Sequence, residues 1–156
     1  MTGLLFWAFA ILYQHYDPLL PPHVAQNFDG AGRAQAWASH EVFWGIGFGM
    51  MALLFVSTHV PALCLRFIPN RLFSLPNRDY WLSPSQRESS IQYLENSLLL
   101  YGNFLFAWML YVFWRVCEAN VQQAPLAHFG IGMLVMLGVT VLWIVALLRR
   151  FRAPGR

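Results

Sequence analysis

Long apolar runs separated by short polar segments constrain this chain more than any other feature. Three runs lie at 42–67, 97–117 and 126–148, and a fourth lies near the N-terminus at 3–20. A helix rises about 1.5 Å per residue, so about 20 apolar residues cross the hydrocarbon core of a bilayer. Hydrophobic residues are 58% of the 156 and charged residues only 11%, whereas soluble domains carry roughly 25% charged residues. A lipid bilayer is therefore the expected surrounding of the chain.

These runs predict an all-α integral membrane protein, a four-helix bundle that forms a single domain. An outer loop is expected at 21–41, between the first two spans, and a connector at 68–96, between the second and the third. The span at 3–20 is short, because its residues rise only about 27 Å. Met1–Tyr13 has no basic region and no small-residue cleavage site, so we interpret it as a retained membrane segment rather than a signal peptide.

The arginines predict the orientation in the membrane, because basic residues are enriched in cytoplasmic loops. Eight arginines fall on one side of the predicted topology: Arg66, Arg71, Arg78, Arg87, Arg149, Arg150, Arg152 and Arg156. Only Arg33 and Arg115 fall on or near the other side. Both termini and the connector are therefore expected in the cytoplasm, and 21–41 outside the cytoplasmic membrane. The arginines form no single basic face, so the net charge of +3 does not indicate a nucleic-acid partner.

Local signals mark the ends of these elements. Pro21 and Pro22 end the first helix, and the run Asp29-Gly30-Ala31-Gly32 is typical of a turn. Ser39 precedes Glu41 and an apolar run, which resembles the start of a helix. Ser83 is the expected N-cap of the helix that leads into the third span.

Four histidines on the outer side are candidate metal ligands. They are His15, His23, His40 and His128. Imidazole groups, together with nearby carboxylates, bind zinc, copper or iron, so a transition metal is the cofactor to consider. Their spacing matches no compact metal motif, and the competing interpretation is that each histidine is hydrogen-bonded locally. No other cofactor is predicted.

Two ionisable residues fall within the predicted spans. His59 lies inside the second span, where an ionisable group is a functional candidate because its burial in lipid is costly. Its alternative is a neutral imidazole hydrogen-bonded across the bundle. Arg115 is placed to pair with Glu118 three residues later, or to extend to the outer headgroups. Gly45 and Gly49 form a small-residue face that would let another helix approach, which is compatible with an oligomer.

Two motifs resemble a known bacterial family. The first is L-P-P-H-V-x-x-x-F-D-x-x-G at Leu20–Gly32, and the second is L-P-N-R-D-Y-W-L-S-P at Leu75–Pro84. Both resemble the family that carries the domain of unknown function numbered 1648. The matching positions include His23, Asp29, Asn77, Arg78, Asp79, Tyr80 and Trp81. The resemblance implies a small bacterial integral membrane protein, whose larger relatives include immunity and signalling proteins of the SdpI type, and it implies no catalytic mechanism.

The sequence leaves three functional hypotheses open. The leading one is a non-enzymatic inner-membrane protein whose outer stretch recognises a peptide or protein partner. The second is a metal-binding protein or metal-dependent membrane enzyme that uses the four outer histidines. The third is a small transporter or proton-linked module that uses His59 with Asn103. The chain shows no Ser-His-Asp, Cys-His or phosphate-loop arrangement, which favours a protein that is not an enzyme.

Overall fold

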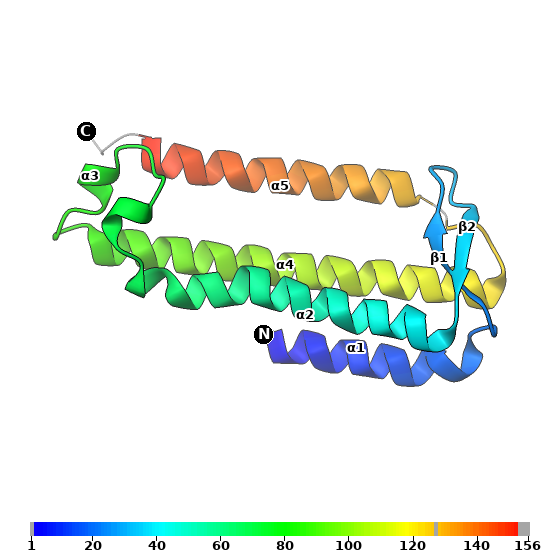
Figure 1. The fold of residues 1–156 in the computed structure, drawn as a ribbon. Coiled ribbons are helices and arrows are strands. Elements are labelled where there is room, and N and C mark those ends of the chain that lie inside the picture. Colours follow the sequence, from blue (N-terminus) through cyan, green and yellow to red (C-terminus); the bar gives the residue numbers. More distant parts are fainter. Residues whose placement is uncertain (1, 127, 153–156) are drawn as a thin grey trace. The chain divides into compact units, whose positions relative to one another are not determined.

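The computed structural model describes residues 2–126 and 128–152 and is mostly helical (Figure 1). The helices are α1 (Thr2–Tyr16), α2 (His40–Cys64), α3 (Arg78–Trp81), α4 (Arg87–Gln122) and α5 (Phe129–Arg152). Three short 3-10 turns lie between them: η1 (Asp17–Leu19), η2 (Leu65–Phe67) and η3 (Asn70–Leu72). Two strands, β1 (Val24–Phe28) and β2 (Ala34–Ala38), form an antiparallel hairpin. The helical prediction is confirmed for most of the chain, and the hairpin corrects the all-α assignment.

Three helical segments of the described chain are long and apolar enough to cross a membrane. They are His40–Phe67, Arg87–Gln122 and Phe129–Arg152, and they coincide with three of the four predicted spans. The first helix differs from its prediction. α1 ends at Tyr16 and its 15 residues rise only about 22 Å, which is less than the roughly 30 Å core of a bilayer. Pro18 has no backbone N–H, and the chain continues past Tyr16 as the tighter turn η1.

The described residues group into two compact units. The first, called the hairpin unit, is drawn from Met1–Leu54 and Asn103–Met136. The second, called the connector unit, is drawn from Phe55–Gly102 and Leu137–Arg156. Each unit has its own cluster of buried apolar side chains.

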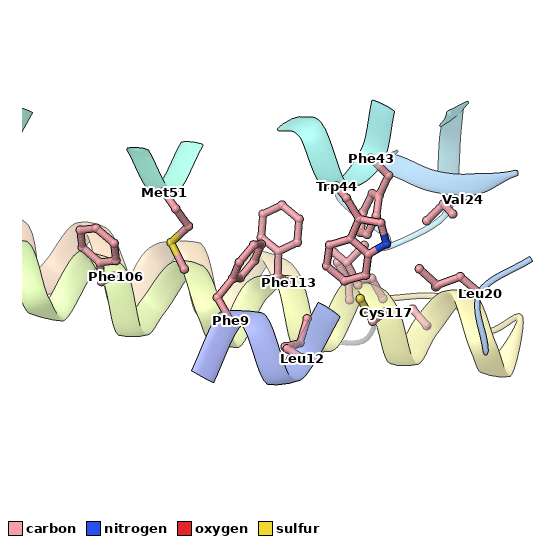
Figure 2. Packing of buried hydrophobic residues seen from close by; sticks show 13 residues of the cluster. Phe9, Leu12, Leu20, Val24, Phe43, Trp44, Met51, Phe106, Phe113 and Cys117 are labelled. Carbon is pink, nitrogen blue, oxygen red and sulfur yellow. The ribbon is translucent and has the colours of Figure 1, made fainter. Parts of the chain in front are cut away.

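The core of the hairpin unit is built around Phe9, which α1 inserts between α2 and α4. Figure 2 shows its ring beside those of Trp44 and Phe113. The ring of Phe9 is edge-on to Phe113 at 5.4 Å and to Trp44 at 6.0 Å between centroids. Such aromatic pairs contribute about 0.5–1.5 kcal/mol each beyond the area that they bury. A Cβ at Gly47 would lie only 2.8–2.9 Å from the rings of Phe113 and Phe9, so a glycine is what lets α1 and α4 approach α2 here.

The hairpin occupies the stretch that the sequence assigned to a loop at 21–41. Its register pairs Val24 with Ala38 and Ala25 with Trp37, and the ladder then shifts before Phe28 meets Ala34. In Figure 1 the hairpin lies beside the end of α4 and the loop that leads to α5. Its two strands are rich in alanine and side-chain amides, which have low strand propensity, and this explains why only the turn was expected.

In the connector unit, the chain after α2 folds over the C-terminal end of α5. The Trp81 indole Nε1 donates to the Phe151 carbonyl at 2.9 Å, and the Asn77 side-chain amide donates to the Arg152 carbonyl. The guanidinium of Arg150 lies over the Trp81 ring, 4.5 Å from its centroid. The last carbonyls of a helix have no partner within the helix, so these contacts satisfy the end of α5. The second family-like motif is thus used locally as a helix cap.

A candidate binding pocket at the hairpin

The turn of the hairpin is closed by the carboxylate of Asp29. Its Oδ1 accepts from the backbone N–H groups of Ala31 and Arg33, each at 2.9 Å, and its Oδ2 accepts from Arg33 Nε at 2.9 Å. The backbone N–H of Arg33 is the largest cause that holds the pKa of Asp29 below its ordinary value of 3.8. Gly32 completes the turn with a φ of +77°, a conformation that favours glycine. The predicted turn is confirmed.

Asn120 of α4 holds the first strand by mimicking a peptide group. Its Oδ1 accepts from Ala25 N at 2.6 Å, and its Nδ2 donates to Ala25 O at 3.0 Å. The same Nδ2 also donates to Val116 O within α4 at 2.9 Å, so the buried amide is satisfied on both sides. One side chain therefore fixes β1 to the end of α4.

The tip of the hairpin is fixed as well. Leu126, in the loop between α4 and α5, donates its N–H to the Gly32 carbonyl at 2.8 Å. A Cβ at Gly32 would collide with the Leu126 carbonyl, so the two backbones approach more closely than any other residue type would allow. The hairpin is thus attached to the rest of the unit at its tip and at its first strand.

His40 fastens the segment that enters the hairpin. Its Nε2 lies 2.6 Å from the Pro21 carbonyl, and its Nδ1 lies 3.3 Å from Asp17 Oδ1. The same Asp17 oxygen accepts from Trp44 Nε1 at 2.8 Å. At the start of α2, Ser39 accepts from Phe43 N through its carbonyl, which confirms the predicted helix start. The chain is therefore held in place both where it enters the hairpin and where it leaves the hairpin.

A pocket of about 410 Å³ lies between the hairpin and the end of α4. Its lining is Pro21, His23, Ala25, Phe28, Arg33, Ala34, Trp37, Ala119, Asn120, Gln123, Ala124 and Pro125. Trp37 is 58% exposed, an unusual state for the largest apolar side chain. The guanidinium of Arg33 is also exposed, and its Nε is the atom that pairs with Asp29. The pocket therefore combines aromatic surface, a cation, an imidazole and a side-chain amide.

The lining limits what the pocket can do. Over the described residues, it contains no carboxylate, hydroxyl or thiol that could act as a nucleophile or as a general base beside His23. A few polar groups around apolar and aromatic walls are what ligand-binding clefts commonly present. The lining is thus of the kind that recognises a ligand.

The four predicted metal ligands lie at separate places. His15 is edge-on to Tyr16 at 4.8 Å, on a surface between α1 and α4, and His128 lines a small cleft near Arg115. His23 lines the hairpin pocket, and His40 bridges Pro21 and Asp17 as described above. Within 2–126 and 128–152, no three His, Cys, Asp or Glu residues are grouped so that they could hold a metal ion.

The predicted polar residues within the spans have local partners. His59 is buried, its Nδ1 lies 2.8 Å from Thr58 Oγ1, and its ring stacks on Phe55 at 5.1 Å. A Cβ at Gly102 would lie 3.1 Å from the ring of His59, so α4 passes close to it within the connector unit. The hydroxyl of Thr58 lies on the same helix as His59, so the alternative of an imidazole hydrogen-bonded across the bundle stays a prediction.

Two further polar residues of the spans lie in the hairpin unit. Asn103 accepts from Thr2 Oγ1 at 2.9 Å, which links α1 to α4. Arg115 pairs with Glu118 at 2.7 Å, which is one of the two alternatives that the sequence left open.

The remaining motif residues belong to the connector unit, and they are distant in sequence from the residues of the hairpin pocket. Arg78 is within 3.4 Å of Asp79, and Tyr80 is edge-on to Trp81. Trp81 is buried among apolar side chains, and Asn77 adopts a left-handed conformation before α3. The first motif of the resemblance, which includes His23 and Asp29, thus belongs to the pocket and its turn, and the second belongs to the connector unit.

Three residues of the pocket were missed by sequence reasoning. They are Trp37, Asn120 and Gln123, none of which belongs to a motif of the sequence. Trp37 lies between two alanines in the sequence, and such small neighbours could have indicated that its large side chain is not packed. Comparisons of the chain with protein-family models, with curated proteins and with solved structures gave no match. The family resemblance therefore rests on its two motifs and stays a prediction.

Proposed function

We propose that this chain is a non-enzymatic protein of the bacterial inner membrane, and that its hairpin pocket binds a peptide or protein partner outside the cytoplasm. The observation that carries the proposal is an open pocket on a firmly attached hairpin, with the indole of Trp37 exposed at its wall. A preformed site loses little freedom on binding, which favours recognition. The immunity or signalling role implied by the family resemblance is one form that this binding would take.

The proposed orientation follows from the arginines. Seven of the nine described arginines belong to the connector unit, and only Arg33 and Arg115 belong to the hairpin unit. The connector unit would accordingly face the cytoplasm, with the hairpin outside. In this arrangement α2, α4 and α5 cross the membrane, α1 is the fourth member of the bundle, and both termini are directed toward the cytoplasm.

Site-specific photo-crosslinking in the native membrane tests the proposal. A photoreactive amino acid at Gln123, on the pocket rim, should form an adduct with a polypeptide of defined mass. Trp37→Ala should remove that adduct, because it removes most of the exposed aromatic wall. The matched control is Trp7→Ala, which deletes an indole of similar exposure, 66%, from α1 outside the pocket. An adduct that survives Trp37→Ala as well as Trp7→Ala would contradict the proposal.

A further inference from the structure

The hydrogen bonds of Ala25 define how the two strands face each other. Both its N–H and its C=O are bonded to Asn120, so both point away from β2. In an antiparallel ladder, such a residue belongs to a pair that is not hydrogen-bonded across the ladder. The partner of Ala25 in the register is Trp37. It follows that the N–H and C=O of Trp37 also point outward, toward the opposite edge of the hairpin.

That opposite edge, formed by β2, is open. The sheet has two strands, and over the part of the chain that the structure describes no recorded hydrogen bond reaches β2 from outside the hairpin. The edge of β1, in contrast, is occupied at Ala25 by Asn120. An unpaired strand edge is a template for another extended chain.

The side chains of β2 suit such an approach. Ala34, Ala36 and Ala38 carry only methyl groups, which leave room beside the backbone. Trp37 presents an exposed indole at the same residue whose N–H and C=O face outward, and this indole borders the pocket. Backbone pairing gives affinity in strand addition, and pockets for alternate side chains give selectivity. Trp37 supplies both components, through its outward backbone groups and through its indole beside the pocket.

We propose that β2 is the docking edge for an extended, net-positive peptide segment of the partner, which adds as a third strand and exchanges two backbone hydrogen bonds with Trp37. The inference rests on the proposed function and specifies how that pocket is used. A row of alternating donors and acceptors matches a peptide backbone, which a lipid chain does not supply. Asp29 is paired with Arg33, so the net negative charge of the segment 17–41 comes from Asp17 and Glu41, which flank the hairpin, and this charge favours a basic peptide.

The test uses the full chain in lipid nanodiscs and a phage-displayed library of random linear peptides. Peptides are selected on the wild type and compared on Trp37→Ala, which keeps the outward N–H, and on Trp37→Pro, which removes it. Proline is tolerated at an open edge, and circular dichroism checks that both variants fold. The selected peptides should be net-positive, should weaken on Trp37→Ala, and should weaken further on Trp37→Pro.

Two readouts report the backbone pairing directly. N-methylation of the selected peptide at alternate residues should weaken binding about tenfold in one register and leave it unchanged in the other, since only one set of N–H groups faces β2. Hydrogen exchange at the Trp37 amide should slow when the peptide binds. The Ala25 amide, bonded to Asn120 with or without peptide, is the internal reference.

Several results would overturn the inference. One is a selection that enriches no peptide. Another is peptide binding that N-methylation does not weaken and that does not slow hydrogen exchange at the Trp37 amide. Selected peptides that are acidic would equally contradict it. Protection of the Trp37 amide in nanodiscs that hold two copies, but not in those that hold one, would assign the edge to a second copy instead. If strand addition fails while the Trp37-dependent adduct at Gln123 persists, the proposed function stands without this binding mode.

Discussion

Replacing Asn120 by alanine should release the hairpin from α4. The substitution removes three hydrogen bonds, two to Ala25 and one to Val116. Only the two bonds to Ala25 join the hairpin to α4, so at about 1 kcal/mol net for each of them local opening of the hairpin becomes easier by about 2 kcal/mol. That corresponds to a rise of about thirtyfold in the opening equilibrium. Buried Ala25 would also lose the partner of both its backbone groups, so the estimate is a lower one.

The assay is native-state hydrogen exchange of residues 24–38, followed by mass spectrometry on the protein in nanodiscs. Gln122→Ala is the matched control, because it removes an exposed amide side chain from the same end of α4. Exchange in the hairpin should accelerate strongly in Asn120→Ala and remain unchanged in Gln122→Ala. If hairpin exchange in Asn120→Ala stayed within a few-fold of the wild type, Asn120 would not be the attachment of β1.

Three other perturbations have defined outcomes. Gly32→Ala should destabilise the hairpin by more than about 1 kcal/mol, since φ is +77° at this residue and an added Cβ would meet the Leu126 carbonyl. Hydrogen exchange of the hairpin amides measures this loss of stability. Gly47→Ala should lower stability in detergent by about 1–3 kcal/mol, whereas Gly45→Ala, with open space around it, should be nearly neutral in thermal unfolding. The pKa of Asp29 is lowered on folding, so its stabilisation is present above 3.8 and is lost as the pH falls through the folded pKa. After correction for the intrinsic exchange rate at each pH, the opening equilibrium of the hairpin should therefore rise in acid, and Asp29→Asn should abolish that dependence.

Hydrophobic length and short-range turn chemistry were predictable from the sequence. The three long helices follow from apolar runs that no soluble core would bury. Asp29 and Gly32 specify their turn through local bonds, and Ser39 begins α2 through a bond four residues along the chain. Each of these features is determined within a few residues, so a single sequence is enough to find it.

The pocket was not predictable, because its parts meet through contacts that are distant in sequence. Asn120 and Ala25 are 95 residues apart, and nothing in an apolar helix marks one asparagine as the partner of a strand. The strands themselves carry alanines and amides in place of the β-branched alternation that identifies a strand. Trp37 was not recognisable either, because composition alone does not separate an anchor at the membrane interface from the wall of a pocket.

The proposed function requires the hairpin pocket to lie outside the cytoplasm. Cysteine labelling in intact cells with a membrane-impermeant maleimide measures this, in a background where Cys64 and Cys117 are replaced by alanine. Gln123→Cys, on the pocket rim, should label in intact cells, and Arg71→Cys, in the connector unit, should label only after the membrane is permeabilised. The opposite pattern, with Arg71→Cys labelled in intact cells and Gln123→Cys protected, would contradict the account.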